Sequence, residues 1–205
     1  MALFFDIPGF MSSLQLLTYP HPTLRHRSQP VTRVNAELKK LVDEMFEIMY
    51  EFRGVGLAAN QVNLPIRLFV ANPSGDKVEG PELVFINPVI NKAKGAAEAE
   101  EGCLSLPGIN AQVKRNKSLQ INAYDLTGSE INAEVDGFLA RIVQHEIDHL
   151  DGVLFIDRLT DELRRPIDAK LQSLANTFDE RQRSGQAPSL ETVKEHIATW
   201  EKMYC

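Results

Sequence analysis

Two histidines four residues apart, with a glutamate after the first, are the most informative feature of this 205-residue chain. They lie in residues 144–149, QHEIDH, which contain an HExxH pattern. Residues four apart lie one turn apart on the same face of an α-helix, so the imidazoles of His145 and His149 can converge on one metal ion. Glu146 then stands close enough to take a proton from a metal-bound water without being a ligand itself. The spacing favours a hydrolytic metal site over a solvated helix face that carries two histidines by chance.

Two histidines do not complete such a site, so a third protein ligand has to come from elsewhere in the chain. In the extended pattern HExxHxxGxxH it would be a histidine, but Phe155 stands at that position. Cys103 is a candidate because small and turn-forming residues flank it in EGCLSLPG, although a free cysteine is commonly just a small buried apolar residue. The other candidates have no distinguishing context or lie in the peripheral C-terminal segment: Glu162, Glu180, Glu191, Glu195 and His196.

Three short motifs, in this order along the chain, resemble the signature motifs of the peptide deformylase family. They are GVGLAANQ at residues 54–61, EGCLS at residues 101–105 and QHEIDH at residues 144–149. The segment TYPHPTLRHRSQPV at residues 18–31 resembles the N-terminal segment of the same family. The resemblance extends over residues 14–180 and implies a hydrolase that removes the formyl group from the N-terminal formyl-methionine of newly synthesised polypeptides. The fold it implies is α+β, with mixed, mainly antiparallel sheets around a central helix that carries HExxH.

The resemblance also implies that Cys103, His145 and His149 are the metal ligands and that a water takes the fourth position. Glu146 would serve as general base towards this water, which attacks the formyl carbon, and then as general acid that protonates the leaving amine. Two imidazoles and one thiolate suit either zinc or ferrous iron. Because the resemblance implies Fe(II) as the working metal in many members, we expect one divalent cation, with Fe(II) in first place and Zn(II) as the alternative.

Further residues would bind the substrate. The resemblance implies an oxyanion hole formed by the Gln61 side-chain amide and the Leu104 backbone N–H. Gly54 and Gly56 have no Cβ, so an extended peptide could approach their backbone and pair with it like an added strand. We expect a methionine-sized pocket beside the metal, for which ordinary core packing is the alternative, lined by Val55, Phe138 and Ile142.

Amphipathic helices and alternating strands must position these residues. Helices are predicted over residues 35–52, 136–150, 162–180 and 189–203. Strands are predicted over residues 67–71 and 82–87 and, as an antiparallel hairpin with one buried face, over residues 119–123 and 131–135. The segment GVGLAANQVNLP is too rich in glycine and small side chains to be predicted as a strand of the packed core. Because helices and antiparallel strands are segregated along the chain, the fold class is α+β.

Composition and charge argue against several classes of protein. With 22 basic and 28 acidic side chains, the formal net charge is −6, which disfavours broad electrostatic binding to DNA or to a membrane surface. No apolar stretch approaches the 18 residues of a membrane span, and residues 1–20 contain none of the basic residues of a secretory or mitochondrial leader. Two cysteines offer no disulfide framework, so we expect a cytoplasmic protein.

We expect three parts in the chain: a disordered N-terminal extension over residues 1–13, a catalytic domain over residues 14–182, and a C-terminal loop and helix over residues 183–205. Some bacterial members of the family reach the ribosome through a basic C-terminal helix. Residues 191–205 hold three glutamates against two lysines, so that mode of docking is not expected here. The expected partners are the nascent formyl-methionine polypeptide and, transiently, the ribosome without such a tail.

Two other interpretations fit the HExxH pattern. An endopeptidase with a carboxylate or a histidine as third ligand would keep its metal and its activity in Cys103→Ser. A structural zinc module would take all four ligands from the protein, with Cys205 or a remote acid as the fourth. Inside the motif, Asp148 points away from the direction of His145, and we expect it to orient a ligand or to pair with a cation such as Arg115.

Overall fold

The computed structural model describes residues 14–205, so the extension predicted over residues 1–13 lies outside the described residues. The α-helices are α1 (Ala36–Glu51), α2 (Gly137–Leu150), α3 (Asp161–Arg183) and α4 (Leu190–Tyr204). The strands are β1 (Gly56–Ala58), β2 (Leu68–Ala71), β3 (Leu83–Lys94), β4 (Ala97–Gly102), β5 (Asn110–Arg115), β6 (Ser118–Tyr124) and β7 (Glu130–Asp136). Short 3-10 helices are η1 (Pro22–Arg25), η2 (Ala59–Val62) and η3 (Phe155–Arg158). No helix within residues 14–205 is both long and apolar enough to cross a bilayer.

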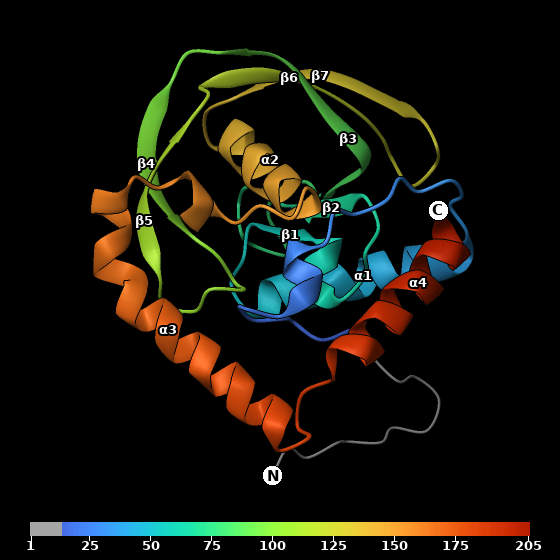
Figure 1. The fold of residues 1–205 in the computed structure, drawn as a ribbon. Helices are drawn as coiled ribbons and strands as arrows, with labels where there is room; N and C mark the ends of the chain where they lie inside the picture. Colours follow the sequence, from blue (N-terminus) through green and yellow to red (C-terminus); the bar gives the residue numbers. More distant parts are fainter. Residues whose placement is uncertain (1–13) are drawn as a thin grey trace.

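The strands form two antiparallel sheets around α2. One sheet has the order β1-β2-β3-β6-β7, and β4 and β5 pair separately as a hairpin. The only parallel pairing among the described residues is an isolated bridge between Gln29 and Ile66. In Figure 1, α2 lies in the middle of the molecule, with β6 and β7 arching over it, the β4–β5 hairpin beside it and α3 and α4 on the outside. The predicted α+β fold around the HExxH helix is confirmed.

The helix α2 is buried along most of its surface because apolar and site residues share it. Its apolar side packs against the inner face of the five-stranded sheet, in a cluster with Phe69, Leu119 and Ile121. Each large apolar side chain buried there stabilises the fold by about 1.5–3 kcal/mol. The helix ends just before Gly152, whose φ is +74° and where a Cβ would lie 2.5 Å from the carbonyl oxygen of Arg25. Packing and a glycine stop therefore fix the position of the HExxH residues.

The predicted helices and strands are all present, but two segments differ from the prediction. Within GVGLAANQVNLP, β1 is a fully buried strand followed by η2, so the prediction that this segment is not a core strand was wrong. Small residues are needed here because a Cβ on Gly56 would lie 2.9 Å from Ile142 of α2. The β4–β5 hairpin was not predicted, because β4 (AEAEEG) alternates small and charged residues without an apolar face.

The C-terminal helix α4 packs onto the rest of the molecule. Val193 and Tyr204 are buried, and the backbone N–H of Thr32 donates to the carbonyl oxygen of Tyr204 over 2.8 Å. His26 and Glu201 form a further contact, with Nε2 and Oε1 2.8 Å apart. The boundary proposed at residues 182 and 183 stays a prediction.

A buried histidine at the start of η1 makes the fold sensitive to acid. His21 caps η1 by accepting from the Thr23 N–H through Nδ1, and its ring lies edge-on to Phe178 with centroids 5.8 Å apart. Burial, with a smaller contribution from His196, lowers the pKa of His21 to about 4. The imidazole is therefore neutral in the folded protein but takes up a proton below about pH 6.5 in the unfolded chain.

We expect the free energy of unfolding to fall as the pH is lowered from 6.5 to 4, since the unfolded state binds more protons in that window. His21 alone accounts for about 3 kcal/mol of this loss. Urea unfolding at pH 7 and pH 4.5, compared between the wild type and His21→Asn, measures the contribution, because asparagine keeps an acceptor for Thr23 but does not titrate. If the free energy of unfolding fell equally with pH in the wild type and in His21→Asn, the contribution assigned to His21 would be contradicted.

Candidate metal centre

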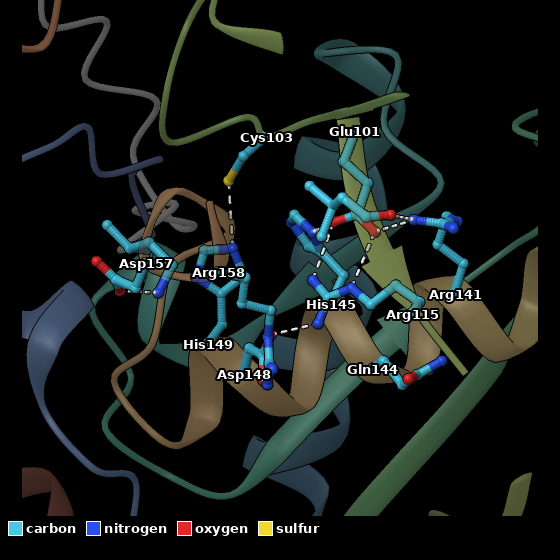
Figure 2. Close-up of polar contacts among 12 residues, drawn as sticks. Glu101, Cys103, Arg115, Arg141, Gln144, His145, Asp148, His149, Asp157 and Arg158 are labelled. Atoms are coloured by element: carbon cyan, nitrogen blue, oxygen red, sulfur yellow. Dashed lines mark hydrogen bonds and ion pairs between the residues drawn. The ribbon is translucent and has the colours of Figure 1, made fainter. Parts of the chain in front are cut away.

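The three predicted metal ligands converge at one point. Cys103 follows the end of β4, and His145 and His149 project from α2 one turn apart. Their ligand atoms all lie within 4.8 Å of one another. The Cys103 Sγ is 3.2 Å from Nε2 of His149, and the two imidazole centroids are 5.0 Å apart (Figure 2). The structure therefore brings together one sulfur and two nitrogen ligands that are 46 or fewer residues apart in the sequence.

The electrostatics of this cluster suit a divalent cation. Burial alone would lower the pKa of His145, but hydrogen bonds with Cys103 and Glu101 raise it to about 10, so positive charge is stabilised at this point. Burial and the neighbouring His145 hold the pKa of His149 well below its ordinary value, which keeps that imidazole neutral. A neutral imidazole is the form that binds a metal, and a thiolate and histidines are ligands for zinc or iron. The donor set and the charges fit one bound cation.

Glu101 is the residue that orients the first histidine. Its Oε2 lies 3.0 Å from Nδ1 of His145, which leaves Nε2 directed towards the cluster. It also accepts from Nε and Nη2 of Arg115, each over 2.9 Å, and from Nη1 of Arg141 over 2.6 Å. Burial alone would raise the pKa of Glu101, but the hydrogen bonds from His145 and Arg115 hold it well below its ordinary value. Glu101 is thus a carboxylate that fixes the ring orientation of a metal-ligand histidine.

The ion-pair network extends from Glu101 to the far side of α2. Arg115, which is 4% exposed, donates to Asp148 as well as to Glu101, so the predicted pairing of Asp148 with Arg115 is confirmed. Arg158 of η3 pairs with the same carboxylate (Figure 2). Arg141 also donates to two backbone carbonyls of the β4–β5 hairpin and so ties α2 to it. Sequence reasoning missed Glu101, Arg141 and Arg158, although Glu101 stands only two residues before the ligand Cys103.

We expect Glu101→Gln to weaken metal binding about 10- to 100-fold, because the amide cannot serve His145 and both arginines as the carboxylate does. Arg115 would then keep only Asp148 as a buried anionic partner, so the substitution should also lower the free energy of unfolding by up to about 3–5 kcal/mol. Titration with a competing chelator and urea unfolding measure the two effects. Glu98→Gln, on the exposed face of the same strand, is the matched control. Unchanged metal affinity in Glu101→Gln would show that the histidine does not depend on this carboxylate.

A cavity of about 390 Å³ opens beside the cluster. Cys103 and His145 line it together with all of the predicted catalytic and substrate-binding residues: Gly54, Val55, Gly56, Gln61, Leu104, Phe138, Ile142 and Glu146. Phe138 is half-exposed at its edge, whereas Ile142 is buried. The cavity is thus the space in which a substrate would meet the metal ligands, and the role of each lining residue stays a prediction.

Glu146 lies at the base of this cavity and is 3% exposed. Its Oε2 has no hydrogen-bond partner among the described residues. Burial raises the pKa of Glu146 to about 7, although the neighbouring His145 acts in the opposite direction. A Cβ on Gly56 would lie 2.5 Å from Oε1, so only glycine lets β1 pass this carboxylate. Glu146 can therefore exchange a proton near neutral pH.

Two donors lie next to Cys103. The Gln61 side chain is held by its Oε1, which accepts from the Ala58 N–H over 2.8 Å. Its Nε2 donates to Oγ of Ser105 over 3.1 Å and lies 3.5 Å from the Cys103 Sγ. The backbone N–H of Leu104 has no acceptor within residues 14–205. Gln61 and Leu104 both line the cavity beside Cys103, and their role as an oxyanion hole stays a prediction.

Comparisons with known proteins agree with this site. A family model described as polypeptide deformylase matches residues 13–165. A peptide deformylase from Rhodopirellula baltica is 50% identical over 191 residues, which are 93% of this chain and 95% of the relative. The chain belongs to the peptide deformylase family. The resemblance inferred from the three motifs is therefore confirmed, and the chain is a metal-dependent hydrolase with a Cys–His–His metal site typical of peptide deformylases.

Solved structures of peptide deformylases share the fold. A crystal structure of a plant peptide deformylase matches with a TM-score of 0.81 at 41% identity and covers 90% of this chain and 99% of its own. A peptide deformylase from Plasmodium falciparum matches with a TM-score of 0.78 at 40% identity and covers 81% of this chain and 98% of its own. A relative from Arabidopsis thaliana, 43% identical over 84% of this chain and 63% of its own length, is named chloroplastic/mitochondrial. Membership of the peptide deformylase family is thus compatible with more than one compartment.

Proposed function

We propose that this chain removes the formyl group from the N-terminal formyl-methionine of newly synthesised polypeptides, with Glu146 moving the proton. The reaction adds water across the C–N bond of the formamide and yields formate and a free α-amine. The observation that carries the proposal is a buried carboxylate with an unpartnered oxygen beside a Cys–His–His cluster, at the base of a cavity. Membership of the peptide deformylase family supports the same reaction.

Cys103, His145 and His149 would hold one divalent cation, for which we propose Fe(II) in first place and Zn(II) as the alternative. When bound, such a cation polarises the formyl carbonyl and lowers the pKa of water at the site. Glu101 and Cys103 beside His145 favour positive charge at this position. The buried network behind α2 would keep the two histidines in place as the cation binds.

Glu146 would act first as a base and then as an acid. Its unpartnered Oε2 would accept a proton from the attacking water and deliver it to the amide nitrogen as the C–N bond breaks. A pKa of about 7 makes both protonation states accessible near neutral pH. The Gln61 Nε2–H and the Leu104 N–H would donate to the oxygen that gains negative charge, and each such donor is worth about 3–4 kcal/mol in the transition state.

The substrate backbone would lie along β1. Within residues 14–205 this strand is at the edge of its sheet and pairs only with β2, and Gly56 on it lines the cavity. An extended peptide could add to Gly54 and Gly56 as a further strand. Its methionine side chain would enter the pocket lined by Val55, Phe138 and Ile142.

We also propose that the chain works in the cytoplasm and meets its substrate on nascent polypeptides, with transient contact to the ribosome. Both cysteines, Cys103 and Cys205, are free, which suits a reducing compartment. The C-terminal helix α4 is not basic, so a ribosome contact would have to use another surface.

Formate release from formyl-Met-Ala-Ser by anaerobically prepared, metal-loaded protein tests this function. We expect one formate and one new free amine per peptide and no cleavage of internal peptide bonds, and we expect Glu146→Ala to release almost none. A wild-type protein that contains metal but leaves this peptide intact would overturn the proposal. Cleavage between amino acids would favour the endopeptidase interpretation instead.

A further inference from the structure

An arginine occupies a strained backbone position at the mouth of the cavity. The helix α1 ends at Glu51, and Arg53 follows its C-cap with a φ of +58°. The N–H of Arg53 donates to the carbonyl oxygen of Tyr50, and the next N–H, of Gly54, donates to that of Met49. Glycine is the usual residue in this left-handed position after a helix, because a Cβ is unfavourable there. A non-glycine residue held in such a conformation is a known mark of sites that contact a ligand.

The charge of Arg53 is not used within the described part of the molecule. Its side chain is exposed and lines the cavity, yet no hydrogen bond or ion pair engages the guanidinium among residues 14–205. Glu100 of β4, the other exposed charged side chain that lines the cavity, does not pair with it. Of the other charged groups of the cavity, Glu101 and Arg141 pair with each other, and Glu146 is buried. Within residues 14–205, the charge of Arg53 is therefore unpaired beside the cavity that a bound peptide would occupy.

The register of β1 indicates which part of a substrate would lie there. Gly56 lies against the Glu146 carboxylate, and Arg53 precedes it by three residues. Three residues of an extended substrate span about 10 Å. A formyl peptide that adds antiparallel to this segment, with its formyl group at Glu146, would bring its second and third residues beside Arg53. This step rests on the proposed function.

We propose that Arg53 makes the enzyme prefer formyl peptides with an acidic side chain at the second or third residue. The guanidinium would donate charge-assisted hydrogen bonds to the substrate carboxylate. The carboxylate of Glu100, which lines the same cavity, would repel an acidic substrate side chain and so limits how large the preference is. The contact would be equally strong in the bound substrate and in the transition state, so it lowers KM and leaves kcat unchanged.

Three peptides with amidated C-termini test this preference: formyl-Met-Asp-Asp-Ala, formyl-Met-Lys-Lys-Ala and formyl-Met-Ser-Ser-Ala. We expect the wild type to have a kcat/KM about fivefold higher for the aspartate peptide than for the lysine peptide, through KM, at low salt. High salt should shrink the difference. Arg53→Glu should reverse the order, whereas Glu100→Gln should increase the preference for aspartate about twofold.

Two further variants separate charge selection from a structural role. Arg165→Glu makes the same change of charge on α3, none of whose described residues line the cavity, and it should leave the three rates unchanged. Arg53→Gly should abolish the preference while raising the melting temperature by about 2 °C, since glycine relieves the strained backbone. The role of Arg53 would be overturned if the protein hydrolysed the serine peptide but had the same kcat/KM for the aspartate and lysine peptides. It would also be overturned if Arg53→Glu kept the wild-type difference in kcat/KM between them. Failure to release formate from all three would overturn the proposed function and this inference with it.

Discussion

Cys103→Ser is expected to lose its bound metal and at least about 100-fold of its formate-releasing activity. A serine hydroxyl is not ionised at neutral pH and does not replace a thiolate as a ligand for zinc or iron. The two histidines alone would leave the cation weakly held and badly placed relative to Glu146. Elemental analysis after dialysis, combined with formate release from formyl-Met-Ala-Ser, measures both losses on the same preparation.

Cys205→Ser is the matched control for this substitution. Cys205 is the other free cysteine, is exposed and does not belong to the metal cluster. It should keep full metal content and activity. If Cys103→Ser also kept both, the third ligand would have to be a carboxylate or another histidine, and the endopeptidase interpretation would regain support.

Glu146→Gln is expected to lower kcat by about 10²- to 10⁴-fold while the metal stays bound. The glutamine fills the same space beside Gly56, but it can neither accept a proton from water nor return one to the leaving amine. Because the carboxylate is buried and its Oε2 has no hydrogen-bond partner among the described residues, its loss should not lower stability. Single-turnover kinetics with metal-loaded protein measure the chemical step directly.

The two substitutions differ in what they remove, and that difference is diagnostic. Cys103→Ser should lose metal and activity together, whereas Glu146→Gln should lose activity alone. Glu134→Gln, on the exposed surface of β7, controls for the loss of a carboxylate. Wild-type rates in Glu146→Gln would mean that another group moves the proton.

The elements that sequence predicted correctly are those in which local spacing reflects burial. The apolar stripe of α1 and the HExxH helix α2 are examples, because one face of each packs against a sheet. The strand β1 was not predicted, since its small residues are explained only by the side chains of α2 that pass over them. The β4–β5 hairpin lacked a signal because its exposed positions carry polar residues, glutamates in β4 and Asn110, Gln112 and Lys114 in β5.

The site was predictable to a similar extent. Helical spacing alone pairs His145 with His149, but it does not identify Cys103, which is 42 residues before the first histidine. That assignment came from the resemblance of three motifs. Glu101 and Arg115 are 14 residues apart on neighbouring strands, so their pairing depends on the register of the hairpin, which the sequence pattern does not supply.

X-ray absorption at the metal edge of anaerobically loaded, active protein tests the ligand assignment most directly. We predict one sulfur at about 2.3 Å, with nitrogen or oxygen ligands at about 2.0–2.1 Å making up the rest, and loss of the sulfur in Cys103→Ser. A metal without a sulfur ligand in the wild type, or with two, would contradict the assignment of Cys103, His145 and His149 as its three protein ligands.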